Sequence, residues 1–556
     1  QPMLEIADSE PLGYISAYGL KPADATGAAD ARMTLRLPLL KDVPIDAVDV
    51  AGTFTLRALA MPGLLPHGGI SDGALVLNVD TNALQAEGML TLAGVPARMT
   101  WREDFAATSE QPTALTLNAT IQPDDLRRFG LAPEPRFAGE ARIAIDALGK
   151  GTEISRGRLA IDFKDAAVRE PLLGWQKPMG QPGNLTGAFR ISQGQFRLVD
   201  AAASGAGLDA LFNLGLDPKA EKLNLDFKQF RLGDTSLAGS MIMNRPQWHL
   251  LLHGTRLDLR PAIEWLYRPG ERDDEAVPLP NVAASITIDE VLLADDEILT
   301  GMVAGVETGG NRWRDVTFTG QLGESGAVSL RIVSDGDQRQ LTLRADDAGR
   351  AARALGLFSQ GEGGDLEVLA DLTGDNAAIA MDGRATMTDF RLREAPTLAR
   401  ILSVGSLTGI ANLARDGGIH FKSFDVPFSM HDGVIDIDDA SANGPALGLT
   451  MTGQFVRSLE RANLKGVIVP AYTLNSFIGK IPILGNILAG GDKEGVFAIN
   501  YQVEGDLTEP QISVNPMSIL TPGILRRILQ GPRGTVEVET PNQSQTDAAQ
   551  SAEAPQ

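Results

Sequence analysis

A strict alternation of apolar and polar residues recurs along most of this chain. In one segment Leu223, Leu225 and Phe227 fall on one side, while the intervening Asn224 and Asp226 fall on the other. A repeat of two is the period of a β-strand whose two faces meet different environments. The sequence therefore predicts many strands with one apolar and one polar face. Side chains expected on the apolar faces include Leu75, Leu77, Leu115, Leu117, Leu223, Leu225, Phe227, Leu341, Leu343, Phe497, Ile499 and Tyr501.

Turn signals separate these segments at short intervals, which favours antiparallel strands in chain order. Ser71-Asp72-Gly73 and Gln193-Gly194 are two examples that we interpret as turns. A glycine also precedes several alternating segments, as at Gly88 and Gly453. The spacing of these glycines is too irregular for a named solenoid repeat.

The composition favours thin sheets over a thick core. Of the 556 residues, 43% are hydrophobic but only 5% are aromatic, while 60 are Gly and 32 are Pro. Aliphatic side chains must therefore do most of the burying, between many turns. Only short helices are predicted, at residues 123–129, 261–266, 347–358 and 396–413. The expected fold class is mainly β, with an elongated, curved antiparallel sheet and a few short α-helices.

Charge and cysteine content exclude several functions. The formal net charge is −22 and no basic stripe with interleaved aromatic residues is seen, so nucleic-acid binding is not expected. The absence of cysteine excludes disulfides and thiolate chemistry. No run of eighteen apolar residues is present, and Gln1-Pro2-Met3 does not open a signal peptide. We expect that an N-terminal part of the natural protein is missing from this sequence.

A search for catalytic or metal-binding residues predicts none. His249 and His253 are four residues apart, but in a strand such residues lie roughly 13 Å apart, so two ordinary strand histidines are favoured over a metal pair. Acidic neighbours such as Asp295-Asp296 are interpreted as solvated loops. We expect no enzyme and no cofactor. A secreted enzyme acting on polysaccharide would need aromatic platforms, and the sequence has only five Trp and five Tyr.

Three stretches together resemble a known family. The first resembles the central region of YhdP-like proteins, and the other two resemble the C-terminal domain of the AsmA-like superfamily. The last stretch is the most specific, because a strand is followed by Asn515-Pro516 and then by an apolar segment. The three stretches are residues 85–101, residues 395–421 and residues 481–523.

The resemblance implies a groove-like β-sheet in the periplasm of a Gram-negative bacterium, anchored in the inner membrane by an N-terminal segment that this chain lacks. Family members are thought to carry phospholipid between the inner and outer membranes. The twelve apolar side chains named above would then line the groove, and envelope proteins are possible partners. The implied organisation is a YhdP-like central region at 1–380 and an AsmA-like region at 381–532. Residues 533–556 lack apolar periodicity and are rich in polar residues, so we expect a disordered tail there.

Several alternatives stay open at this point. The same alternation describes a closed sandwich whose faces pack on each other. A scaffold that helps outer-membrane proteins mature through exposed strand edges is the second functional hypothesis. An apolar helix is predicted at residues 519–529, and it could cap the sheet or touch a membrane surface. Its apolar side chains are Ile519, Leu520, Ile524, Leu525, Ile528 and Leu529.

Overall fold

The chain is mainly β, as the sequence predicts. Within the residues described below, the computed structural model contains 31 strands and four short α-helices. Of these strands, 28 belong to one open sheet and three to a second, small sheet. The structure describes residues 24–517 except 39–48, 66–67, 106–110, 129–136, 171–172, 245, 267–280, 310–311, 325, 337, 375–378, 394, 405–409, 412–416, 432, 457–460, 471–497 and 507–509.

Two compact units divide the chain. The first contains Gln1–Arg344, Arg350–Ser359 and Asp371–Ala380, and the second contains Ala345–Gly349, Gln360–Ala370 and Met381–Gln556. One of the divisions falls between residues 380 and 381. The predicted tail at 533–556 lies outside the described residues.

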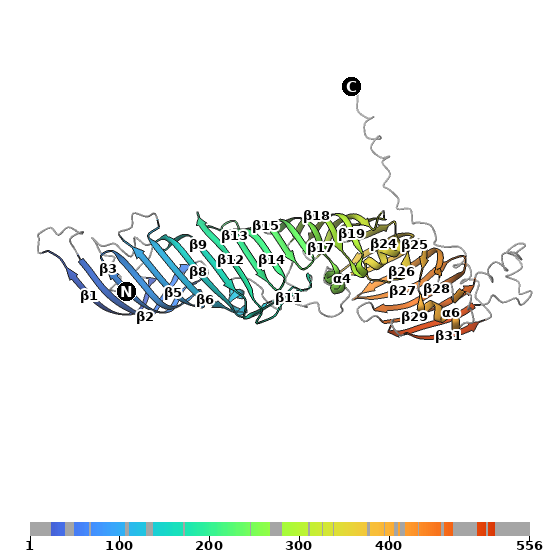
Figure 1. Cartoon of the computed structure of the whole chain (residues 1–556), viewed down its shortest axis with the longest axis horizontal. Helices are drawn as coiled ribbons and strands as arrows, with labels where there is room; N and C mark the ends of the chain where they lie inside the picture. The colour runs from blue at the N-terminus through green and yellow to red at the C-terminus, as the bar shows by residue number, and fades with distance from the viewer. Residues whose placement is uncertain are drawn as a thin grey trace, which may run out of the picture. The chain divides into compact units, whose positions relative to one another are not determined.

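The first unit is built from strands that follow one another side by side in chain order (Figure 1). Two helices, α3 (Pro123–Arg128) and α4 (Arg260–Leu266), and the 3-10 helix η4 (Ala294–Asp296) interrupt them. Its strands are β1 (Thr26–Arg36), β2 (Asp49–Leu65), β3 (Gly68–Asp80), β4 (Ala83–Leu92), β5 (Val95–Asp104), β6 (Thr113–Ile121), β7 (Phe137–Gly139), β8 (Ala141–Lys150), β9 (Glu153–Asp162), β10 (Ala166–Glu170), β11 (Trp175–Lys177), β12 (Gly183–Ser192), β13 (Gln195–Gly205), β14 (Leu208–Asp217), β15 (Lys222–Leu232), β16 (Thr235–Asn244), β17 (Gln247–Asp258), β18 (Asn281–Leu292), β19 (Ile298–Gly309), β20 (Arg312–Leu322) and β21 (Gly326–Asp335).

Among the described pairings of this unit, neighbouring strands are antiparallel except for β17 and β18. The short strands β7, β10 and β11 form the small sheet, so β6 pairs with β8 and β9 pairs with β12. β17 and β18 are parallel, and α4 lies in the connection between them. The short turns in the sequence predict antiparallel pairs throughout, and this prediction is wrong for β17 and β18. These two strands are joined by a long crossover connection, which allows a parallel pair.

The second unit continues the same strand-after-strand pattern. β25 to β29 pair antiparallel in chain order, then β29 pairs with β30 and β30 with β31. β22 (Gln338–Ala345), α5 (Ala348–Ala354) and β24 (Asp365–Thr373) have residues in both units. The other elements are β23 (Gly361–Glu362), β25 (Ala380–Leu392), α6 (Pro396–Val404), β26 (Ile419–His431), β27 (Val434–Asn443), β28 (Leu447–Val456), β29 (Arg461–Pro470), β30 (Ala498–Asp506) and β31 (Gln511–Met517).

Some turn signals in the sequence prove to be bulges inside strands. Ser71-Asp72-Gly73 is not a turn, because it lies within β3, where the register with β4 shifts between Ser71 and Ala74. Asp72 has a φ of 51°, and Asp200 and Asp439 have similar values at register shifts in β13 and β27. Asp tolerates this left-handed conformation better than most residues, so it can serve a bulge as well as a turn.

Two glycines of the recurring glycine-first segments sit where neighbouring backbones come very close. Gly88 in β4 has a φ of 153°, and a Cβ atom there would lie 2.1 Å from the carbonyl oxygen of Ala74. Gly453 in β28 has a φ of 137°, and a Cβ atom would lie 2.0 Å from the carbonyl oxygen of Asn463. The glycine is required because no side chain fits between the strands.

We expect Gly88→Ala to lower the free energy of unfolding by about 2–4 kcal/mol, because the new Cβ meets backbone and the φ is strained. Gly215→Ala is the matched control, since its Cβ would meet only Asn224 Cβ at 3.9 Å. Urea denaturation followed by circular dichroism measures both variants. Equal stability of the two variants would contradict the account of Gly88.

Candidate functional site

One face of the first unit carries an unbroken row of apolar residues. The row follows the residues that lie directly opposite each other on successive paired strands, from β1 to β21. Directly opposite residues share a face of the sheet. In order, the row is Ala31, Phe54, Leu77, Ala86, Trp101, Leu115, Ala147, Gly157, Phe189, Leu198, Leu214, Leu225, Met241, Leu250, Ala284, Val306, Val316 and Ile332.

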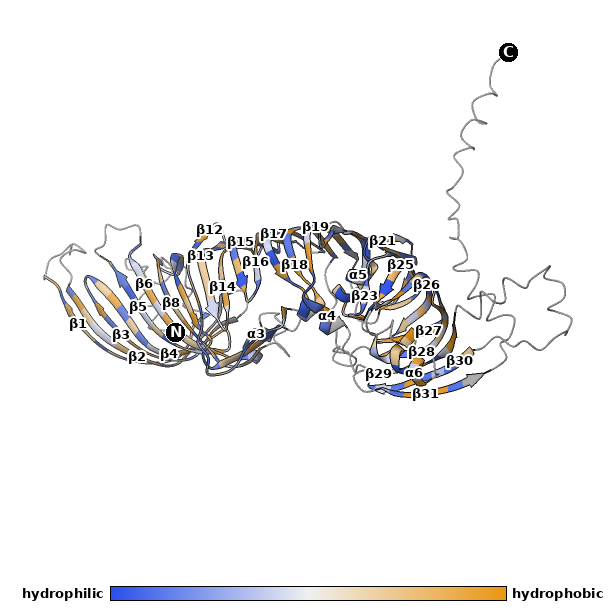
Figure 2. Cartoon of the chain, turned by 45° about the vertical axis from the view of Figure 1, so that its right-hand side comes forward, coloured by the Kyte–Doolittle hydropathy of each residue, from blue (hydrophilic) through white to orange (hydrophobic). Residues whose placement is uncertain are grey.

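We call the face that contains this row the apolar face. Figure 2 shows hydrophobic and hydrophilic residues alternating along its strands. Leu214, Leu225, Met241 and Leu250, in the middle of the row, are each only partly buried. Side chains between two packed sheets would be almost fully buried. The described residues therefore leave this part of the apolar face accessible to solvent, which favours an open sheet over a closed sandwich.

Clusters of side chains pack within the apolar face without covering it. Phe189 and Leu198 are buried in one cluster, and Leu159, Leu214 and Phe212 pack against them while staying partly exposed. The rings of Phe212 and Phe227 lie 6.3 Å apart between centroids. Such contacts along the sheet hold the side chains in place while one side stays open.

The small sheet covers one margin of the apolar face. Phe137 on β7 and Ala166 on β10 form a buried cluster with Ala141, against which Ile121 and Ile161 pack. Lys177 on β11 is buried beside it, and its ammonium donates to the carbonyl oxygen of Ala166 at 2.7 Å. Burial lowers the pKa of Lys177. The sequence does not predict this small sheet, because β7, β10 and β11 are too short to show the alternation of apolar and polar residues that marks a strand.

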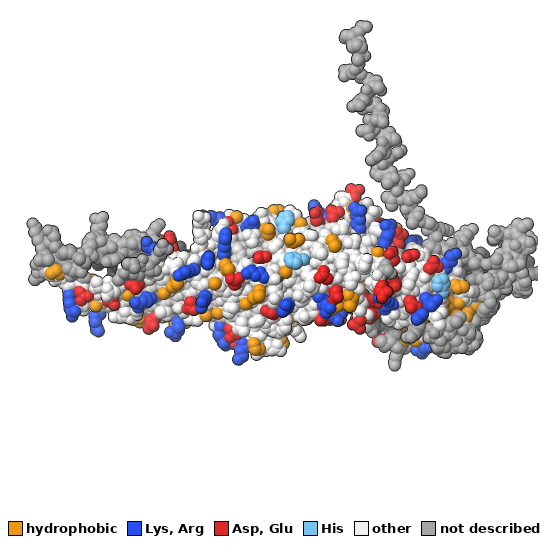
Figure 3. Space-filling view, turned by 45° about the horizontal axis from the view of Figure 1, so that its top comes forward, with side chains coloured by type: hydrophobic (Ala, Val, Ile, Leu, Met, Phe, Trp, Pro, Cys, Tyr) orange, Lys and Arg blue, Asp and Glu red, His pale blue; other side chains and the backbone are white. Residues whose placement is uncertain are grey.

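The opposite face of the first unit is mainly polar, although it also carries exposed apolar side chains such as Leu251 and Val303. Thr53, Asn78, Gln85 and Arg102 lie opposite one another on β2 to β5 and point away from the apolar face. The space-filling view of Figure 3 shows acidic and basic side chains scattered between small hydrophobic patches. This separation lets one side of the sheet remain hydrated along its length.

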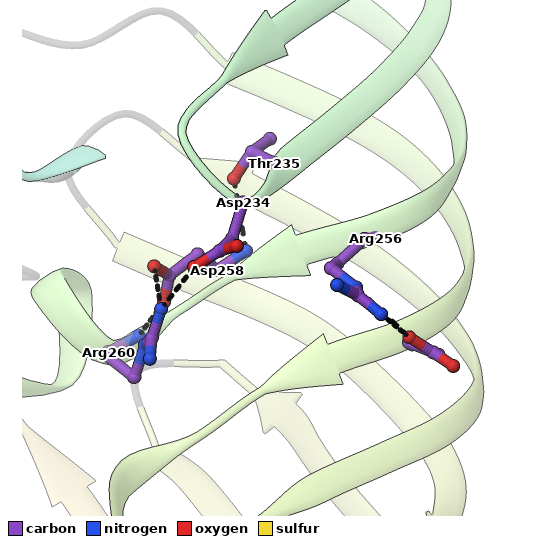
Figure 4. Close-up of polar contacts among 6 residues, drawn as sticks. Asp234, Thr235, Arg256, Asp258 and Arg260 are labelled. Atoms are coloured by element: carbon purple, nitrogen blue, oxygen red, sulfur yellow. Dashed lines mark hydrogen bonds and ion pairs between the residues drawn. The ribbon is translucent and has the colours of Figure 1, made fainter. Parts of the chain in front are cut away.

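A cluster of charged groups holds the start of α4 after β17 (Figure 4). Arg260 donates to both carboxylate oxygens of Asp258, at 2.8 and 2.7 Å, and to Asp234 at 2.7 Å. The hydrogen bonds from Arg260 hold the pKa of Asp258 below its usual value. Arg256 on β17 binds Glu290 on β18, with Nε 3.0 Å from Oε2. All of these charges are paired, so we interpret the cluster as support for the crossover.

In the second unit the equivalent apolar positions are closed. Ile499 and Tyr501 lie on one face of β30 and are 0% and 8% exposed. Ile499 lies opposite Ile468, which is also fully buried, and the Tyr501 hydroxyl donates to the carbonyl oxygen of Thr450 at 2.9 Å. The alternation is the same as in β15, but these side chains belong to a packed core.

The predicted groove residues therefore fall into four groups. Seven lie together on the apolar face, whereas Ile499 and Tyr501 are buried in the second unit. Leu341 and Leu343 lie on one side of β22, partly buried. Phe497 and the predicted helix at 519–529 lie outside the described residues. The seven on the apolar face are Leu75, Leu77, Leu115, Leu117, Leu223, Leu225 and Phe227.

Sequence reasoning missed several members of the apolar face. Trp101, Met241 and Leu250 are three of them. Trp101 lies between two polar residues, which gives a signal in retrospect, whereas Met241 and Leu250 are each followed by an apolar residue that hides the alternation. His249 and His253 are exposed on the polar face of β17. Among the described residues, no group of three or more His, Asp or Glu could hold a metal ion. No described helix is both long and apolar enough to cross a membrane.

Comparisons with models of protein families, with curated proteins and with solved structures found no match for this chain. The resemblance to the AsmA-like superfamily therefore stays a prediction.

The open apolar face of the first unit and the closed core of the second unit should respond differently when a charged side chain replaces an apolar one. We expect Leu225→Asp to lower the free energy of unfolding by only about 1–2 kcal/mol, because the carboxylate can reach water at the open face. Ile499→Asp should lower it by more than about 4 kcal/mol, because the charge enters a closed core. Urea denaturation of both variants measures the difference, and equal losses would contradict an open apolar face.

Burial raises the pKa of the Tyr501 phenol. Above pH about 10 the phenol ionises in the unfolded chain but not in the folded one, so the second unit should lose stability as pH rises through this range. Tyr501→Phe should remove this loss, and should cost about 1 kcal/mol at neutral pH for the missing hydrogen bond. Urea midpoints of both proteins between pH 8 and 12 provide the test, and parallel pH curves would contradict the burial of Tyr501.

Proposed function

We propose that this chain is a periplasmic member of the AsmA-like superfamily that binds phospholipid acyl chains on its apolar face and conducts phospholipid between the inner and outer membranes. The observation that carries the proposal is the unbroken, partly exposed apolar row from β1 to β21. In this proposal an N-terminal segment outside this sequence anchors the protein in the inner membrane. The protein has no catalytic role and needs no cofactor.

The energetics of lipid transfer favour such a surface. Burying a methylene group is worth about 0.8 kcal/mol, so exposing two acyl chains to water costs on the order of tens of kcal/mol. A continuous apolar face, mostly aliphatic with Phe54, Trp101 and Phe189 among its members, offsets this cost along the path. Aliphatic side chains form no hydrogen bonds. A lipid acyl chain can therefore slide from Leu214 to Leu225 to Met241 without breaking a hydrogen bond.

The row is long enough for several lipids. Its eighteen positions are separated by seventeen strand spacings of about 4.8 Å, which gives a path of about 80 Å along the first unit. The hydrocarbon core of a whole bilayer is only about 30 Å thick. The polar face keeps the loaded protein hydrated.

A scaffold for outer-membrane proteins is the second candidate, and one observation favours it. All eleven residues of β1 are exposed, and Met33 and Leu35 are 61% and 51% exposed. An exposed strand with apolar side chains can accept a strand from a client protein. In that case binding would depend on β1 and not on β15.

We expect phospholipid to co-purify with the full chain and to be detected by native mass spectrometry and lipid extraction. Leu225→Asp or Phe227→Asp should reduce the bound lipid at least fivefold, because each places a charge on the lipid path. Asn224→Asp is the matched control, since it adds the same charge to the polar face of the same strand. Lipid-free protein, or equal losses in variants and control, would refute lipid binding at this face.

A further inference from the structure

Three arginines from separate parts of the sequence meet on the polar face. Arg156 on β9 lies directly opposite Arg190 on β12, and Arg190 lies directly opposite Arg197 on β13. In antiparallel pairs, side chains directly opposite each other have Cβ atoms about 4.5–5.5 Å apart. We call these three residues the arginine row. It lies next to Gly157, Phe189 and Leu198 in the chain and therefore on the reverse of the apolar face.

The arginine row has no counter-charge among the described residues. All three side chains are exposed, and none has a hydrogen bond or ion pair with a described residue. Like charges directly opposite each other destabilise a sheet. The chain carries a net charge of −22, so carboxylates are more common in it than basic groups. Even so, none of the described carboxylates pairs with these three arginines.

The nearest carboxylates are engaged elsewhere. Asp146, diagonal to Arg156, accepts a hydrogen bond from Thr116 Oγ1 at 2.9 Å and lies opposite Arg158. Asp217, diagonal to Arg197, accepts from Gln195 Nε2 at 2.9 Å and from the Lys219 and Ala220 backbone amides at 3.1 Å. Neither forms an ion pair with the arginine row, so three guanidinium groups remain available to a ligand.

We propose that Arg156, Arg190 and Arg197 form a binding site for a phosphate-bearing anion. A guanidinium group presents two parallel N–H donors that match two phosphate oxygens, and it stays charged at every physiological pH. Two strand spacings of about 4.8 Å place the outer arginines about 10 Å apart, so adjacent side chains can converge on one phosphate or bind two linked phosphates. The bound anion would remove the repulsion within the row.

The site does not depend on the proposed lipid path, because it occupies the other face. The ligand could be a soluble phosphate compound or the phosphate of a membrane lipid headgroup. Both share the chemistry that the arginine row recognises. Two probes separate them, namely inorganic pyrophosphate in solution and vesicles of phosphatidylglycerol compared with vesicles of phosphatidylcholine.

The test compares the full chain with Arg156→Gln/Arg190→Gln/Arg197→Gln. Pyrophosphate binding is measured by calorimetry at low ionic strength, and vesicle binding by flotation. The triple variant should bind the effective probe at least tenfold more weakly, and should melt at a higher temperature without ligand because the repulsion is gone. Arg→Lys at the same positions should give intermediate binding, since charge remains but the paired donors are lost.

The matched control is Arg98→Gln/Arg231→Gln/Arg331→Gln, which removes equal charge from isolated exposed positions. It should bind the probe like the unaltered chain. Binding of pyrophosphate alone would identify a soluble ligand, and binding of phosphatidylglycerol vesicles alone a lipid headgroup. The proposal is overturned if neither probe binds, or if the control variant loses as much affinity as the triple variant.

Discussion

The cross-strand register is the constraint on which the rest of the first unit depends. Each strand must place its apolar residues opposite those of its neighbour, because a slip of one residue would turn them to the polar face. The row from Ala31 to Ile332 keeps this alignment through every pairing, including the parallel one. Bulges help, since the extra residue at Asp200 shifts the alternation in β13 while Leu198 and Ala201 keep the same face.

The strands and their faces could be predicted from the sequence where alternation is clean, as in Leu223–Phe227. The alternation is interrupted at Asp72 and Asp200, and there a turn and a bulge have the same local signature. The parallel pair was not predictable, because its cause is a crossover that sequence periodicity does not encode. The short strands of the small sheet were missed for lack of length.

The site was predictable only in part, for a related reason. Leu225 and Ile499 both lie in segments where apolar and polar residues alternate, but Leu225 is partly exposed and Ile499 is fully buried. That difference depends on what packs above each face, which is a tertiary property. Arg156, Arg190 and Arg197 give no signal in the sequence, because they are 34 and then 7 positions apart, and only the register brings them together.

The mostly antiparallel order of the first unit has a consequence for how such a chain can change length. Adding or deleting one hairpin inserts or removes two neighbouring strands, changes the path by about 10 Å and restores the original strand direction. A duplicated hairpin between β12 and β16 would therefore leave both flanks unchanged. The parallel pair of β17 and β18 is different, because its two strands are joined by the longer connection that contains α4 and not by a tight turn. The sheet can therefore be lengthened in fixed steps of one hairpin on either side of the parallel pair.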